Sequence, residues 1–200
     1  MKVELLSGTG TRQRRAELAA LLGDAVAHGA RLGFGLPLDA GAADAYWQGV
    51  AGEVATGDRV LLVALDERGR LVGSAQLLLD ERTLGRDRAQ VQKVMVKHSC
   101  RGRGIGAALM ARIEAEARAA GRSLLVLDTT TGASGASVFC RRMGYACAGE
   151  ITTAAPFLGG RPLGRTSFVK RVPAPVPFPL PSPAAAPPPG VQFGVARAQR

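Results

Sequence analysis

The sequence predicts an α/β (α+β) fold in which about four helices cover one mixed sheet of about seven strands. Two apolar, β-rich runs, 59–65 and 71–79, are joined by a short charged connection that contains Gly69, as is typical of an antiparallel hairpin. An almost wholly apolar run, 123–128, follows an amphipathic helix, which indicates a parallel strand buried on both faces. A glycine-rich turn at 101–106 lies between the hairpin and that run.

The N-terminal part of the chain is predicted to form one short strand and two helices. Residues 3–6 form the strand, and Thr11 is in the position of a helix N-cap. Apolar residues then recur at helical spacing, so a helix is expected to run to about Gly29. Asp39 is a second candidate N-cap, and the stripe after it stops at Gly57, a residue suited to a C-cap. The two apolar stripes are Leu18, Leu21, Leu22, Ala25 and Val26, and Ala43, Trp47, Val50 and Val54.

The second half of the chain continues the sheet. A strand at 90–96 precedes the glycine-rich turn, and the helix after the turn stacks Ile105, Leu109 and Ile113 on one face. The run 123–128 is expected to lie parallel to strand 90–96 across this helical crossover. The remaining expected elements are a short helix at 136–143 and two strands at 145–151 and 165–171.

One domain at residues 1–172 and a disordered proline-rich tail at 173–200 are the expected organisation. The chain has 200 residues, and its 46% hydrophobic content is enough to bury a core without metals or disulfides. Proline recurs at every second position from 173 to 183, which removes backbone donors and favours an extended chain. No apolar run reaches about 18 residues, so we expect a cytoplasmic protein without a membrane partner.

The composition limits the ligands that can be expected. A net charge of +10 favours an anionic partner, either a nucleic acid or a small polyanion such as a coenzyme with several phosphates. Cys100, Cys140 and Cys147 form no C-x-x-C pair and no Cys/His pair at zinc spacing. We therefore expect free thiols and no metal.

The strongest functional motif is the turn Arg101-Gly102-Arg103-Gly104-Ile105-Gly106. A strand, a glycine-rich turn and a helix that opens within it bring unpaired backbone N–H groups and the positive end of a helix dipole to one point. Glycines let a phosphate approach the main chain, and Arg101 and Arg103 add positive charge. The turn is therefore expected to bind a diphosphate.

Three other interpretations address the same residues. Gly102-x-Gly104-x-x-Ala107 satisfies the dinucleotide-binding fingerprint, with Asp128 at a suitable distance to bind a ribose. Against it, a hairpin precedes the motif and too little chain follows Asp128 to complete a doubly wound sheet. A solvated arginine turn leaves the three spaced glycines unexplained. A Walker phosphate loop is excluded because no G-x-x-x-x-G-K-S/T occurs.

The turn, with the strand before it and the helix after it, resembles the Q/R-x-x-G-x-G/A signature of the GNAT acyltransferases, and the order of elements is similar to theirs. Two further stretches, 29–34 with Trp47 and 127–129, resemble the tabtoxin-resistance subset of small-molecule acetyltransferases. The resemblance implies the GNAT acyl-CoA N-acyltransferase fold, in which strands 90–96 and 123–128 splay apart. It also implies acetyl-CoA as cosubstrate and direct transfer of the acetyl group to a primary amine.

The resemblance further implies roles for individual residues. Backbone amides at 94–96 would bind the pantetheine arm and polarise the thioester carbonyl. The position at which these enzymes often carry a tyrosine acid holds Cys140, and that of a glutamate base in the closer relatives holds Gln90, which could only orient a water or the amine. Asp128 is the remaining acidic candidate. The predicted cofactor-binding residues are Val94, Met95, Val96, Arg101, Gly102, Arg103, Gly104, Ile105, Gly106 and Ala107; the catalytic ones are Asp128, Cys140 and Gln90; and the substrate-pocket ones are Phe34 and Trp47.

Alternatives remain open at this point. Cys140 can equally be a small buried filler, Asp128 a cap for the loop after it, and Trp47 a core residue. The expected acceptor is a small-molecule amine; a protein N-terminus or lysine is the second candidate. The third is a CoA-binding module weakened at Gln90 and Cys140, or a basic surface for nucleic acid. Nucleic acid is not the expected partner, and a homodimer is compatible with the sequence.

Overall fold

The computed structural model describes residues 1–30, 32–35, 37–79, 86–130, 135–151 and 164–173. Within these ranges the chain forms one seven-stranded sheet in the order β1-β2-β3-β4-β5-β7-β6. The β4–β5 pair is parallel and the other neighbouring strands are antiparallel, which confirms the predicted mixed sheet. No helix in the described ranges is long and apolar enough to cross a membrane. The expected proline-rich tail, from residue 174 on, lies outside them.

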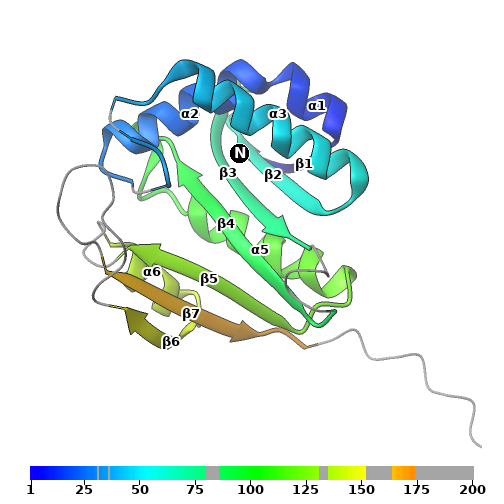
Figure 1. Ribbon diagram of the computed structural model, residues 1–200, viewed down its shortest axis with the longest axis vertical. Coiled ribbons are helices and arrows are strands. Elements are labelled where there is room, and N and C mark those ends of the chain that lie inside the picture. The colour runs from blue at the N-terminus through cyan, green and yellow to red at the C-terminus, as the bar shows by residue number, and fades with distance from the viewer. Residues whose placement is uncertain (31, 36, 80–85, 131–134, 152–163, 174–200) are drawn as a thin grey trace, which may run out of the picture.

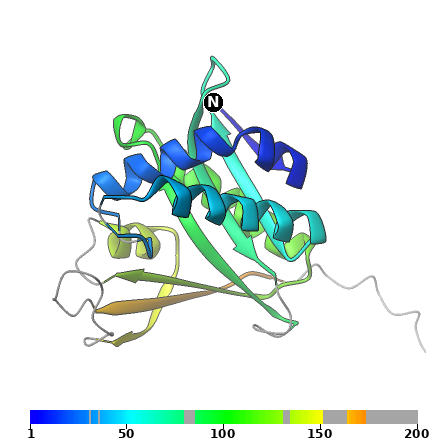
Figure 2. The same cartoon turned by 45° about the horizontal axis from the view of Figure 1, so that its top comes forward.

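The strands are β1 (Lys2–Leu6), β2 (Arg59–Leu65), β3 (Leu71–Leu78), β4 (Arg88–Val96), β5 (Leu124–Thr130), β6 (Ala146–Ile151) and β7 (Arg165–Arg171). The helices are α1 (Gly8–Gln13), α2 (Arg15–Ala27), α3 (Ala40–Thr56), α5 (Ile105–Ala119) and α6 (Ala136–Arg142), with a 3-10 turn, η1, at His98–Cys100. Helices α2 and α3 cover one face of the sheet over β2 to β4, and α5 lies on the opposite face (Figures 1 and 2).

The N-terminal helical region differs from the prediction. Two helices separated at Arg14 replace the single helix expected from Thr11, so the described residues hold five α-helices rather than about four. Ser7 is the N-cap of α1, and its hydroxyl accepts a backbone hydrogen bond at 3.0 Å. Thr11 is buried inside α1 instead of capping it, and it donates to the Ser7 carbonyl at 2.8 Å. Gly8 permits this early start because a Cβ there would lie 2.8 Å from the Ala51 carbonyl oxygen in α3.

Helix α3 follows the prediction at both ends. Asp39 caps its N-terminus by accepting a hydrogen bond from the Ala42 amide at 2.6 Å. Gly57 ends it with a φ of 84°, a left-handed conformation that favours glycine. The buried face of α3 includes Trp47, which is fully buried in a core cluster with residues of α2 and β2.

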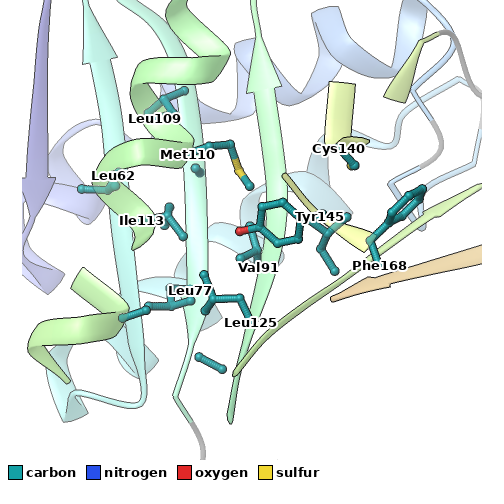
Figure 3. Packing of buried hydrophobic residues seen from close by; sticks show 14 of the residues in the cluster. Leu62, Leu77, Val91, Leu109, Met110, Ile113, Leu125, Cys140, Tyr145 and Phe168 are labelled. Atoms are coloured by element: carbon teal, nitrogen blue, oxygen red, sulfur yellow. The ribbon is translucent and has the colours of Figure 1, made fainter. Parts of the chain in front are cut away.

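A second core cluster lies on the other face of the sheet. Figure 3 shows Leu109, Met110 and Ile113 of α5 directed toward the sheet, where all three are fully buried. Gly73 in β3 allows α5 to pack this closely, because a Cβ there would lie 3.1 Å from Leu109 Cδ1. Helix α5 is thereby held against the sheet, and its N-terminus is fixed beside the end of β4.

Strands β4 and β5 diverge halfway along their length. They pair in parallel from Arg88 with Leu124 to Val91 with Leu127, and the described residues show no further pairing between them. Strand β4 nevertheless stays paired with β3 as far as Val96. The last five residues of β4 therefore present an edge without a ladder partner toward β5, as the predicted splay requires.

Candidate active site

A cavity of about 600 Å³ occupies the region where β4 and β5 diverge. It extends from the glycine-rich turn along 94–96 to Asp128, and it reaches Leu32 on the side of α2. Helices α5 and α6 form other parts of its wall. The predicted site residues that line it are Val94, Met95, Val96, Arg101, Gly102, Gly104, Ile105, Gly106, Ala107, Asp128 and Cys140. Gln90, Arg103, Phe34 and Trp47 are not part of the lining.

The glycine-rich turn has the backbone geometry of an anion site. Gly102 and Gly104 adopt φ values of 77° and 78°, and Gly104 is the N-cap of α5. The amides of the first turn of α5 have no partner inside the helix and lie at its positive end. Gly106 must be small because a Cβ there would approach the Phe139 ring to 3.3 Å. These features act through the main chain, which is why the sequence motif could predict them.

The cations around this turn differ from the expected set. Arg101 lines the cavity, and its Nε donates to the Val96 carbonyl at 3.2 Å, which ties it to the end of β4. Arg103 is exposed and does not line the cavity, so its expected place beside the phosphates is not seen. Arg142, at the end of α6, does line it. No motif marks Arg142, because its position depends on how α6 packs.

Asp128 lies at the cavity wall within a set of hydrogen-bond donors. Ser167 Oγ donates to Oδ1 at 2.6 Å, Gln90 Nε2 donates to Oδ2 at 3.3 Å, and Arg165 forms an ion pair with Oδ2. Burial raises the pKa of Asp128, but the hydrogen bonds from Arg165 and Ser167 outweigh it and hold the pKa below its ordinary value. The carboxylate is therefore ionised at neutral pH and is a weak base.

A directed series of hydrogen bonds runs across the strands of the sheet from β2 to Asp128 in β5. The buried Arg59 guanidinium donates to Gln92 Oε1 at 2.9 Å, and Gln92 Nε2 donates to Gln90 Oε1 at 2.8 Å. Gln90 in turn donates to Asp128. The amide oxygen of Gln90 thus accepts from Gln92, and Gln90 is not part of the cavity lining. These contacts support Asp128, and the expected role of Gln90, to orient a water or the amine, stays a prediction.

The sequence contains a signal for this series of hydrogen bonds that lies outside any motif. Arg59 also contacts Glu53 at 2.5 Å and Gln76 at 2.6 Å, and Gln76 is fully buried in β3. Polar residues in otherwise apolar strands require partners when they are buried. Gln76 and Gln92 stand side by side in the ladder between β3 and β4, so strand pairing would have identified them as a cluster.

Cys140 lines the cavity, and burial raises the pKa of its thiol to about 11. The thiol therefore keeps its proton at neutral pH. To act as the acid, Cys140 would have to give this proton to the leaving thiolate. If that thiolate has an ordinary thiol pKa, about 8.5, the transfer costs about 3 kcal/mol. Cys140 is a poor acid for this purpose, which favours the interpretation as a buried filler.

Phe34 and Trp47 do not form an acceptor pocket together. Trp47 lies in the core cluster because its stripe on α3 faces α2 and β2, and this corrects its assignment to the pocket. Phe34 is half-buried and packs edge-on against Tyr46, with ring centroids 5.4 Å apart. Among the described residues, no group of three His, Cys, Asp or Glu side chains comes together as a metal site would require.

Replacing Asp128 by Asn should lower the free energy of unfolding at pH 7 by about 1–2 kcal/mol, because charge-assisted hydrogen bonds are lost. A depressed pKa in the folded state stabilises the protein above the unfolded pKa, about 3.9, and this contribution is lost as pH falls through the folded pKa. The difference between wild type and variant should therefore shrink below about pH 4. Urea unfolding at pH 7 and pH 3 measures it, with the exposed Asp87→Asn as control. An equal difference at both pH values would contradict the pairing.

Comparison with known proteins agrees with this geometry. Residues 57–147 match the family model described as "Acetyltransferase (GNAT) domain". A ribosomal-protein-alanine N-acetyltransferase from Brucella melitensis is similar, with a TM-score of 0.70 and 23% identity over 86% of this chain and 99% of that chain. An N-acetyltransferase from Staphylococcus aureus Mu50 has a TM-score of 0.69 and 17% identity over 86% of this chain and 98% of that chain. A GNAT superfamily phosphinothricin acetyltransferase from Sinorhizobium meliloti, in complex with acetyl-CoA, has a TM-score of 0.68 and 20% identity over 86% of this chain and 88% of that chain.

These likenesses establish the fold and exclude the doubly wound dinucleotide-binding alternative. The closer resemblance to the tabtoxin-resistance subset stays a prediction.

Proposed function

We propose, on the premise that this chain carries a GNAT acetyltransferase domain, that it transfers an acetyl group from acetyl-CoA to the primary amine of a small molecule. The observation that most directly supports this is one continuous cavity that joins the anion-binding turn to the divergence of β4 and β5. A diphosphate at Gly102 to Ala107 directs the rest of the coenzyme along the unpaired edge of β4. The acyl group would then lie near Asp128.

The reaction joins the amine nitrogen to the acetyl carbon and breaks the bond between that carbon and sulfur. The amine loses one proton and the leaving thiolate gains one. Amides of the free β4 edge, at 94–96, would donate to the thioester oxygen as negative charge develops on it. The main contribution of the chain in this proposal is thus to position the reactants and to stabilise the oxyanion.

Proton transfer in this proposal involves water rather than a dedicated side chain. Gln90 and Gln92 cannot accept a proton at neutral pH, and Asp128 is a weak base because Arg165 and Ser167 hold its pKa down. Asp128 can still accept a hydrogen bond from the amine and orient it. The reacting species is then the fraction of acceptor that is already neutral in solution.

The convergence of separate segments at the acceptor end of the cavity favours a small molecule over a protein. Its lining there comes from three separate segments, represented by Leu32, Lys93 and Asp128. The similar proteins named above do not decide the matter, since one acts on a ribosomal protein and another on phosphinothricin. A CoA-binding module without turnover is the second candidate, because Gln90 replaces the expected glutamate base.

A turnover screen with acetyl-CoA tests this function. The wild-type chain is incubated with small primary amines and, separately, with peptides that offer an N-terminal alanine or a lysine, and released CoA thiol is measured. We expect turnover with at least one small amine and none with the peptides. The Gly104→Glu variant measures the background rate of thiol release. Tight binding of acetyl-CoA without turnover on any amine would instead support the second candidate, and absence of binding would overturn both.

A further inference from the structure

Strand β4 contains a bulge beside the acceptor end of the cavity. Ser74 of β3 pairs with Met95 whereas Gln76 pairs with Gln92, so β4 holds one residue more than β3 across this interval. Lys93 lies in the bulge with a φ of 48°, and no other non-glycine residue of the described ranges has a positive φ. A left-handed conformation costs such a residue about 1–2 kcal/mol. Strain of this kind beside a cavity is typical of a functional position.

The bulge directs the Lys93 side chain toward the segment between α2 and α3. Its Nζ donates to the Leu32 carbonyl at 2.5 Å and lies 5.5 Å from the ring centroids of both Phe34 and Tyr46. An ammonium group has three N–H donors, and the described residues supply an acceptor for one of them. Two donors are therefore available to a ligand in the cavity that Lys93 lines.

Lys93 also has no ion-pair partner among the described residues. Two other described cations near the network around Asp128 are paired: Arg59 with Glu53, and Arg165 with Asp128. No carboxylate of the described ranges lies within ion-pair distance of Lys93. Burial lowers the pKa of Lys93, and the charge of Arg59 lowers it further. An anion supplied by a ligand would favour the ammonium form and offset both effects.

We propose that Lys93 binds an anionic group of the acceptor, so that the amine acetylated by this chain also carries a carboxylate or a similar anion, as an amino acid does. This inference rests on the function proposed above and names the acceptor class. Polyamines, which bring further cations, are repelled.

Matched pairs of acceptors test the proposal. Initial rates are measured for amino acids, for their carboxamides and for aminoalkylphosphonates, with each rate expressed per concentration of neutral amine. Wild type should prefer the anionic member of a pair by tenfold or more in kcat/KM, since a charge-assisted hydrogen bond is involved. Lys93→Met should reduce this preference to about twofold, mainly by raising KM for the anionic member. Lys93→Arg should restore part of the preference.

Lys97→Met is the matched control, because Lys97 is exposed near the end of β4 and does not line the cavity. It should keep the full preference. A second measurement needs no variant: short carboxylic acids without an amine should inhibit wild type competitively against the acceptor, and their carboxamides should not.

The outcomes separate the two proposals. An unchanged preference in Lys93→Met, or equal rates for acids and carboxamides in wild type, would overturn the role of Lys93 and leave the acetyltransferase function standing. Absence of turnover with every amine in wild type would overturn the proposed function itself. Unchanged acetyl-CoA affinity in Lys93→Met shows that the variant is folded.

Discussion

The Gly104→Glu variant is expected to bind acetyl-CoA at least 100-fold more weakly than wild type and to lose thiol release in proportion. Gly104 caps α5 with a φ of 78°, and a Cβ built there meets no atom within 4 Å, so the side chain fits at a strain of about 1–2 kcal/mol. The new carboxylate lies where the turn is proposed to hold a diphosphate. At a separation of about 5 Å and an effective dielectric constant near 20, each pair of like charges costs about 3 kcal/mol.

The chain offers a matched control for this prediction. Gly121, beyond the other end of α5, also has a positive φ, 72°, and open space around its Cβ position. Gly121→Glu introduces the same side chain and similar strain away from the cavity, so its acetyl-CoA affinity should stay within about twofold of wild type. Calorimetric titration measures both variants. If Gly104→Glu binds acetyl-CoA as tightly as Gly121→Glu, the turn does not hold the diphosphate.

Trp47→Ala should lower the free energy of unfolding by about 3–5 kcal/mol, which is a large part of the stability of an ordinary domain. Trp47 is fully buried among Leu18 and Leu22 of α2 and Leu61 of β2, so truncation leaves a cavity that its neighbours fill only partly. Urea unfolding at pH 7 measures the change. The protein that remains folded should keep its KM for the acceptor.

Phe34→Ala serves for comparison, because Phe34 is half-buried at the edge of the same cluster and contacts Lys93. It should destabilise the fold less than Trp47→Ala and should raise KM for anionic acceptors. A Trp47→Ala variant with nearly wild-type stability and an increased KM would return Trp47 to the acceptor pocket.

Hydrophobic periodicity predicted most of the fold. The apolar stripe of α5 and the apolar runs of the central hairpin and of β5 are local patterns, and burial imposes them on any chain that forms these elements. The early start of α1 was missed because it depends on a close approach to α3, where Gly8 meets Ala51. Such a contact joins residues far apart in the sequence and leaves no periodic signal.

The geometry of the glycine-rich turn could be predicted for a similar reason. It depends on backbone amides and on glycines with left-handed φ values, and both follow from a few consecutive residues, Gly102 to Gly106. The acceptor end of the site could not be predicted in this way. Its lining comes from separate segments that include Leu32, Lys93 and Asp128, and the hydrogen-bonded network that supports Asp128 also includes residues of β2 and β7, so the distances depend on strand register.

By itself, the amino-acid sequence determined the class of fold and the backbone geometry of the glycine-rich turn. The tertiary structure alone decided that Gln90 supports Asp128, that Trp47 belongs to the core and that Lys93 faces the cavity. The physical reason is that each depends on contacts between elements far apart in the sequence. For Lys93 it is the bulge in β4, because one extra residue changes which side chains face each side of a strand and no local pattern records that shift.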